Sequence, residues 1–127
     1  MRKAQRMRVL ITGATTWTDI ESLRRELSQL PKDCVIVTGD TLGVDALAIT
    51  LAQQLGFGVE AMHKIEQDYV LYPDDGWKGL NHRMLNTGID LVLAFHPDYG
   101  KPGMARGTQH AVELAEQLGI QAHIFCA

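Results

Sequence analysis

The chain has 127 residues, the size of one domain with its own hydrophobic core, so we expect residues 1–127 to form a single domain. Its 12 Lys and Arg residues against 15 Asp and Glu residues give a net charge of -3, which disfavours duplex nucleic acid as a partner. No apolar run approaches the roughly 18 residues of a membrane span, and the basic start of the chain precedes too short an apolar run for a secretion signal. Cys34 and Cys126 lie in apolar runs, which indicates buried thiols in a reducing compartment. We therefore expect a cytoplasmic location and no membrane partner.

Short apolar runs alternate with segments of helical periodicity along the chain. The apolar runs predict strands at Arg8–Thr12, Cys34–Thr38, Phe57–Met62, Leu91–Phe95 and Gln121–Phe125. The periodic segments predict helices at Asp19–Leu30, Leu42–Leu55, Gly79–Asn86 and Thr108–Leu118. Thr18 and Glu21 have the spacing of a capping box for the first helix. The polar stretch Lys64–Lys78, with Pro73 and Gly76, is predicted to be a loop.

This alternation predicts an α/β fold: a doubly wound, Rossmann-like parallel sheet of five strands with helices on both faces. Right-handed crossovers favour the strand order 3-2-1-4-5, with the switch point between the first and fourth strands. Ligands of such sheets bind at the carboxyl ends of the strands near that point. The predicted crevice is formed by Gly13–Trp17, Gly39–Asp45 and His96–Thr108.

Glycine-containing turns follow the first and second strands and open the helix after the fourth. Glycine lets the backbone approach a bound group, and a helix N-terminus presents free N–H groups to an anion. We therefore predict a site for a nucleotide-like small molecule. The candidate ligand-binding residues are Gly13, Thr15, Thr16, Trp17, Gly39, Asp40, Thr41, Gly43, Asp45, His96, Arg106, Gly107 and Thr108.

Several of these residues also have a purely structural interpretation. Gly39 and Gly43 suit turns and close packing, and Asp45 suits a cap on the free N–H groups of its helix. Trp17 either stacks on a base or packs beneath the first turn. Thr108 either binds an anion or only opens its helix. Both interpretations stay open for each residue.

Acid–base chemistry has three candidate residues: Asp45, His96 and Glu113. His96 directly follows the fourth strand, where a neutral imidazole can bond a ligand or carry a proton. The five histidines, His63, His82, His96, His110 and His123, form no pair or Cys/His cluster with metal-ligand spacing, so no metal cofactor is expected. The sequence identifies no other cofactor.

Four motifs in order carry a family resemblance. They are V-L-I-T-G with W-T-D, then V-T-G-x-x-x-G-x-D-A-L-A, then N-H-R-M-L with D-L-V-L-A-F-H-P, and finally R-G-T with A-x-x-L-G-I. The chain resembles the small bacterial and phage proteins of the YspA type from about Arg8 to Phe125. That type is a branch of the SLOG superfamily, which includes the lysine-decarboxylase-like "lonely guy" phosphoribohydrolases and the DprA Rossmann-like domain. The resemblance implies a Rossmann-like sheet and a ligand derived from a nucleotide.

The chain departs from this pattern at arginine positions. The YspA-type pattern has arginines where this chain has Thr15, Leu42, Leu80 and His82. Because arginine binds phosphate through two parallel hydrogen bonds, the departure favours a neutral or singly charged nucleoside-like ligand over a triphosphate, and Asp40 adds repulsion.

The phosphoribohydrolases are similar at a P-G-G-x-G-T-x-x-E stretch, where the glutamate acts at the sugar. This chain keeps Gly107-Thr108 but has Ala111 at the glutamate position. Glu113 lies about 200° further around the helix and does not replace it. That activity is therefore disfavoured.

Three functions remain after these comparisons. The first is a binding module for a nucleotide or nucleotide derivative, and we favour it. The second is a nucleotide-processing enzyme that hydrolyses an N-glycosidic or phosphoribosyl bond. The third is a structural or partner-binding protein with a vestigial pocket. Because helix Leu42–Leu55 is apolar around most of its circumference, we also expect a homodimer.

Overall fold

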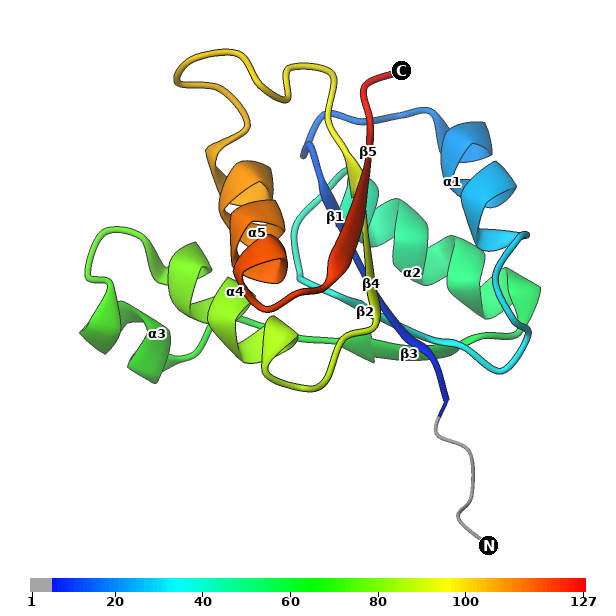
Figure 1. Cartoon of the computed structure of the whole chain (residues 1–127), viewed down its shortest axis with the longest axis horizontal. Coiled ribbons are helices and arrows are strands. Elements are labelled where there is room, and N and C mark those ends of the chain that lie inside the picture. The colour runs from blue at the N-terminus through cyan, green and yellow to red at the C-terminus, as the bar shows by residue number, and fades with distance from the viewer. Residues whose placement is uncertain (1–5) are drawn as a thin grey trace, which may run out of the picture.

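The computed structural model describes residues 6–127, so residues 1–5 of the basic start lie outside it. Five strands alternate with helices along the chain (Figure 1). The strands are β1 (Arg8–Gly13), β2 (Val35–Thr38), β3 (Gly58–Ala61), β4 (Leu91–Phe95) and β5 (Gln121–Phe125). The helices are α1 (Ile20–Leu27), α2 (Val44–Leu55), α3 (Glu66–Leu71), α4 (Gly76–Leu85) and α5 (Arg106–Gln117).

The strands form one parallel sheet in the order β3-β2-β1-β4-β5. The predicted doubly wound α/β fold and its strand order are therefore confirmed. β1 lies between β2 and β4, with Leu10 beside both Val37 and Val92. From β1 the strand order runs to one side through β2 and β3, and to the other side through β4 and β5. The switch point of the sheet therefore lies between the carboxyl ends of β1 and β4.

Helices cover the two faces of the sheet (Figure 1). On one face, α1 and α2 pack over Val9 and Ile11 of β1. On the other, α4 and α5 pack over Leu10, and α3 packs on α4. Alternate residues of β1 therefore enter opposite cores, as the two-residue period of a strand requires.

The segment 64–78 differs from the prediction. It contains α3 and the start of α4, so the predicted loop is wrong. Asp68 of α3 is buried, and both its carboxylate oxygens accept hydrogen bonds from Arg83 of α4, at 2.8 and 2.6 Å. The same carboxylate accepts from the backbone N–H of Ile65 at 2.9 Å. A six-residue helix is thus held by contacts with α4, which local periodicity does not reveal.

Two smaller predictions need correction, and a third loses its support. Asp19, rather than Thr18, caps α1, because its carboxylate accepts from the backbone N–H of Ser22 at 3.2 Å. Cys34 is buried as predicted, whereas Cys126 is exposed beyond the end of the edge strand β5. Helix α2 is covered within the chain by α1 and by β1, β2 and β3, so its apolar surface is no evidence for a dimer.

Candidate functional site

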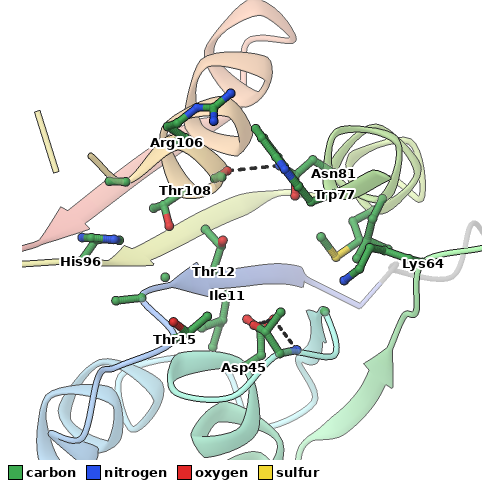
Figure 2. Close-up of a pocket in the computed structure, with 18 residues that line it drawn as sticks. Ile11, Thr12, Thr15, Asp45, Lys64, Trp77, Asn81, His96, Arg106 and Thr108 are labelled. Atoms are coloured by element: carbon green, nitrogen blue, oxygen red, sulfur yellow. Dashed lines mark hydrogen bonds between the residues drawn. The ribbon is translucent and has the colours of Figure 1, made fainter. Parts of the chain in front are cut away.

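A pocket of about 420 Å³ lies at the carboxyl ends of β1, β2 and β4 (Figure 2). Its walls come from the turns after β1 and β2, from α4, and from the start of α5. The structure brings nine of the predicted ligand-binding residues together there: Gly13, Thr15, Gly39, Thr41, Asp45, His96, Arg106, Gly107 and Thr108.

The other four predicted residues do not line this pocket. Thr16 is exposed on the first turn, and Asp40 pairs with His63 and Lys64, each at 3.2 Å. Trp17 is buried against Phe95, and its indole N–H donates to the backbone oxygen of Asp19 and to Ser22. Trp17 therefore packs in the core beneath the first turn, where its indole is not available to stack on a base.

Gly43 supports the pocket from outside. It has φ +74°, and a Cβ atom there would lie 2.5 Å from the carbonyl carbon and oxygen of Thr15. The next residue, Val44, donates its backbone N–H to the carbonyl oxygen of Ala14 at 3.1 Å. Only glycine combines this backbone conformation with this contact, so α2 begins directly beneath the turn after β1.

Gly13 allows an equally close contact on the other side of that turn. A Cβ atom on Gly13 would overlap the carbonyl oxygen of Phe95 and lie 2.6 Å from a methyl group of Val44. The following residue, Ala14, donates its N–H to the same carbonyl oxygen at 2.9 Å. The turn that lines the pocket is thus fixed between β4 and α2.

Asp45 lines the pocket, and the residue is only 7% exposed. One carboxylate oxygen accepts from the hydroxyl of Thr41 at 2.8 Å and from its backbone N–H at 3.3 Å. The other lies 3.0 Å from the hydroxyl of Thr38, which is also 2.8 Å from the carbonyl oxygen of Ile11.

Burial raises the pKa of Asp45, and the hydrogen bonds from the two threonines oppose that rise. Within residues 6–127, no Lys or Arg forms an ion pair with this carboxyl group. Both oxygens are engaged by neighbouring threonines, so Asp45 joins α2 to β1 and β2 and presents little free carboxylate to a ligand.

The start of α5 forms the polar end of the pocket. The first hydrogen bond of its opening turn runs from the N–H of Gln109 to the carbonyl oxygen of Ala105 at 2.8 Å. Ala105 has φ +55°, and no side chain caps the helix. The N–H groups of Arg106, Gly107 and Thr108 therefore precede the helix's own hydrogen bonds and are available to an anion.

Two side chains extend this polar end. Thr108 is 5% exposed, and its hydroxyl has no hydrogen-bond partner among the residues that the structure describes. It faces the pocket beside Thr12 and His96 (Figure 2). The ring atom Nδ1 of His96 accepts the N–H of Asp98 at 3.0 Å. In its neutral form this ring therefore carries its proton on Nε2, which makes Nε2 a hydrogen-bond donor.

Pocket residues of α4 and the segment before α3 were missed by sequence reasoning. Trp77, Leu80, Asn81 and Met84 of α4 line the pocket, and so does Lys64. Their spacing along α4, i, i+3, i+4 and i+7, is typical of one helix face. That pattern was the available signal, but the predicted loop over Lys64–Lys78 hid its first member, Trp77.

The remaining acid–base candidate, Glu113, lies outside the pocket. It is exposed on α5, where it accepts a hydrogen bond from the side chain of Gln109 at 2.9 Å. Ala111, at the position of the phosphoribohydrolase glutamate, is fully buried. Across residues 6–127, no three His, Cys, Asp or Glu side chains gather in a way that could hold a metal ion.

Residues 7–64 match the family model described as the YspA, cpYpsA-related SLOG family. This segment is therefore similar to that family. It runs from the residue before β1 to Lys64 and supplies the turns after β1 and β2, including Asp45. The similarity to this family suggests a ligand-binding module for molecules related to nucleotides.

A search of curated proteins finds no match. None of the helices among the described residues is both long enough and apolar enough to cross a membrane.

Proposed function

We propose that this chain is a binding module for a nucleotide-derived small molecule that carries one anionic group. The observation that carries the proposal is the hydroxyl of Thr108, which lines the pocket at the uncapped start of α5 and has no hydrogen-bond partner among residues 6–127. Together with the free N–H groups of Arg106 and Gly107, this hydroxyl suits a single phosphate or carboxylate.

The distribution of cations supports a single anionic group. Lys64, at the opposite end of the pocket, is paired with Asp40 at 3.2 Å. Lys78 is paired with Asp75 at 3.5 Å. Arg106 lines the pocket and forms no ion pair within residues 6–127, and it also lies 5.8 Å from the ring of Trp77. One such cation is adequate for one phosphate and gives little support to a second and a third.

The enzyme hypothesis has weaker support from the same geometry. General acid–base catalysis needs a carboxyl group or imidazole within hydrogen-bond reach of the reacting atom. The carboxyl group of Asp45 is engaged by Thr38 and Thr41, and Glu113 lies outside the pocket. His96 alone keeps a free ring N–H toward the pocket, and a binding role uses that group equally well.

We also propose that the chain forms a homodimer. Because α2 packs on α1 and on the sheet, its apolar character gives this dimer no support, and sedimentation at micromolar concentration tests it. A protein that only binds partners through a vestigial pocket would bind no nucleotide, which calorimetry measures directly. A cytoplasmic location is part of the same proposal.

Calorimetric titration with adenosine, AMP and ATP tests the proposed function. We expect AMP to bind more tightly than adenosine, and ATP to bind no more tightly than AMP. Thr108→Val keeps the side-chain volume and removes the hydroxyl, so it should weaken AMP binding about tenfold or more, as the loss of a hydrogen bond to a charged group does.

His123→Ala, an exposed substitution on β5 outside the pocket, is the matched control and should leave AMP binding unchanged. Tighter binding of ATP than of AMP would contradict the single-anion proposal. Absence of binding to all three ligands would contradict the binding function itself.

A further inference from the structure

Helix α4 presents a largely apolar face to the pocket. Leu80 and Met84 are 4% and 3% exposed, and Trp77 lies beside them with its indole ring partly exposed. The ring is held from behind by His110, whose ring packs edge to face with it at a centroid distance of 5.5 Å. This end of the pocket therefore offers a firm apolar surface to a flat ring.

Asn81 is the polar group on that face, and it is only 6% exposed. Its side-chain nitrogen lies 3.1 Å from the carbonyl oxygen of Gly107 and 3.1 Å from Nδ1 of His110. Because a carbonyl oxygen only accepts hydrogen bonds, the atom that faces Gly107 must be the amide nitrogen. Figure 2 shows this hydrogen bond joining α4 to the start of α5.

The two hydrogen bonds use both protons of the amide nitrogen of Asn81. Nδ1 of His110 then acts as an acceptor, which requires an unprotonated Nδ1. Burial lowers the pKa of His110, with further lowering by the neighbouring His82 and Lys78, and so favours this state. The orientation of the amide is therefore fixed from two sides.

The side-chain oxygen of Asn81 is left without a partner among residues 6–127. Since Asn81 lines the pocket and its nitrogen faces α5, this oxygen is the polar atom that the side chain offers to a ligand. It accepts hydrogen bonds and donates none. The complementary ligand group is therefore an N–H donor at the edge of a flat, largely apolar ring.

We propose that the α4 face, formed by Trp77, Leu80, Asn81 and Met84, is a subsite for a nucleobase that carries an exocyclic amino group. The base packs against Trp77, Leu80 and Met84, and its amino group donates to the oxygen of Asn81. This proposal rests on the proposed function, with the anionic group held at the start of α5. A base with a carbonyl group at the same position, such as hypoxanthine, places two acceptors against each other and binds more weakly.

The chain offers a direct optical probe of this subsite, because it contains only two tryptophans. Trp17 lies in the core and does not line the pocket. In the variant Trp17→Phe, Trp77 is the only indole that reports on the ligand. We expect AMP to change the fluorescence of Trp77 on binding, and ribose 5-phosphate to bind more weakly with no such change.

Calorimetry on the unmodified chain tests base selection without any substitution. We expect AMP to bind about tenfold more tightly than IMP, the effect of one hydrogen bond to the amide oxygen of Asn81. Asn81→Ala should remove this difference, whereas Asn86→Ala, an exposed asparagine at the end of α4, should preserve it.

The outcomes separate this proposal from the function on which it rests. Equal binding of AMP and IMP by the unmodified chain would overturn base selection by Asn81. Binding of ribose 5-phosphate as tight as that of AMP would overturn the base subsite and leave the anion site intact. Absence of binding to AMP, IMP and ribose 5-phosphate would overturn the proposed function itself.

Discussion

Helix α2 begins at Gly43 and ends at Gly56, and these two glycines give a matched pair of substitutions. Both have positive φ, +74° and +84°. An alanine at Gly56 adopts the αL conformation (ψ 14°) at a cost of about 1–2 kcal/mol, whereas Gly43 (ψ -125°) lies outside the αL region, in a conformation that costs other residues about 1–3 kcal/mol. Their surroundings differ, because nothing lies within 4 Å of a Cβ atom at Gly56, whereas at Gly43 it would lie 2.5 Å from the carbonyl group of Thr15.

The crowding at Gly43 adds a packing cost to the backbone strain. Overpacking of a well-packed region costs about 1–3 kcal/mol, so Gly43→Ala should lower the free energy of unfolding by about 2–6 kcal/mol. Gly56→Ala should lower it by about 1–2 kcal/mol. Gly43→Ala also displaces the turn after β1, which lines the pocket, and should weaken AMP binding in the protein that remains folded.

Urea denaturation of the two variants and the unmodified chain measures both costs, and the difference between the variants combines the packing cost at Gly43 with the difference in backbone strain. A Gly43→Ala protein that is no less stable than Gly56→Ala would refute the reasoning. In that case the contact between α2 and the turn after β1 would not constrain the residue at position 43.

Three further predictions concern charged groups. The pKa of Asp68 is lowered by its hydrogen bonds to Arg83, so its stabilisation is present above the unfolded pKa of about 3.9 and is lost as pH falls through the folded value. Asp68→Asn should therefore cost about 2–4 kcal/mol at pH 7 and much less below pH 3, as measured by urea denaturation at both pH values. Burial raises the pKa of Asp45, so its ionisation destabilises the fold as pH rises from the unfolded pKa. The stability of Asp45→Asn relative to the unmodified chain should thus rise between pH 3 and 7, and thermal melts that show no such trend would contradict this. Arg106→Ala should weaken AMP binding about tenfold with little effect on adenosine, while Lys101→Ala, outside the pocket, should change neither in calorimetry.

The parts of the fold that sequence predicted well are those governed by burial along the strand. β4 and β5 have the predicted bounds, Leu91–Phe95 and Gln121–Phe125. A doubly covered parallel strand reads as a continuous apolar run, and the runs at β1, β2 and β4 were of this kind. The order of the strands followed from the handedness of the crossovers, which leaves few arrangements for five strands.

Helix α3 could not be found in this way because its stability comes from tertiary contacts. It has six residues, and Val70 and Leu71 are exposed at 63% and 62%. Its buried residue is the carboxylate of Asp68, which pairs with Arg83 fifteen positions later. The periodicity of apolar residues in one segment does not reveal that Asp68 pairs with Arg83, or that Val70 and Leu71 are exposed.

The glycine turns of the site were predictable for a related reason, since close backbone contacts demand glycine wherever they occur. The contacts of Gly43 with the first turn illustrate this, although they place it behind the pocket wall and not in it. Sequence alone does not separate a glycine that faces a ligand from one that faces another turn. The same ambiguity applied to Trp17, whose indole is used for core packing and two internal hydrogen bonds.

The pocket has two walls of different origin, and this division bears on ligand choice. One wall is formed by the turns after β1 and β2, which lie within residues 7–64. Asp45, at the start of α2, belongs to the same segment, and its oxygens are already engaged by threonines. Two groups that remain free to bond a ligand, the hydroxyl of Thr108 and the oxygen of Asn81, lie beyond residue 64 on α5 and α4, while the hydroxyls of Thr12 and Thr15 line the pocket from within the matched segment. Selectivity between similar ligands arises from free groups that one ligand satisfies and another leaves unpaired. Substitutions of Thr108 and Asn81 should therefore change which ligand is bound, whereas substitution of Asp45, with both oxygens engaged, should affect all ligands alike.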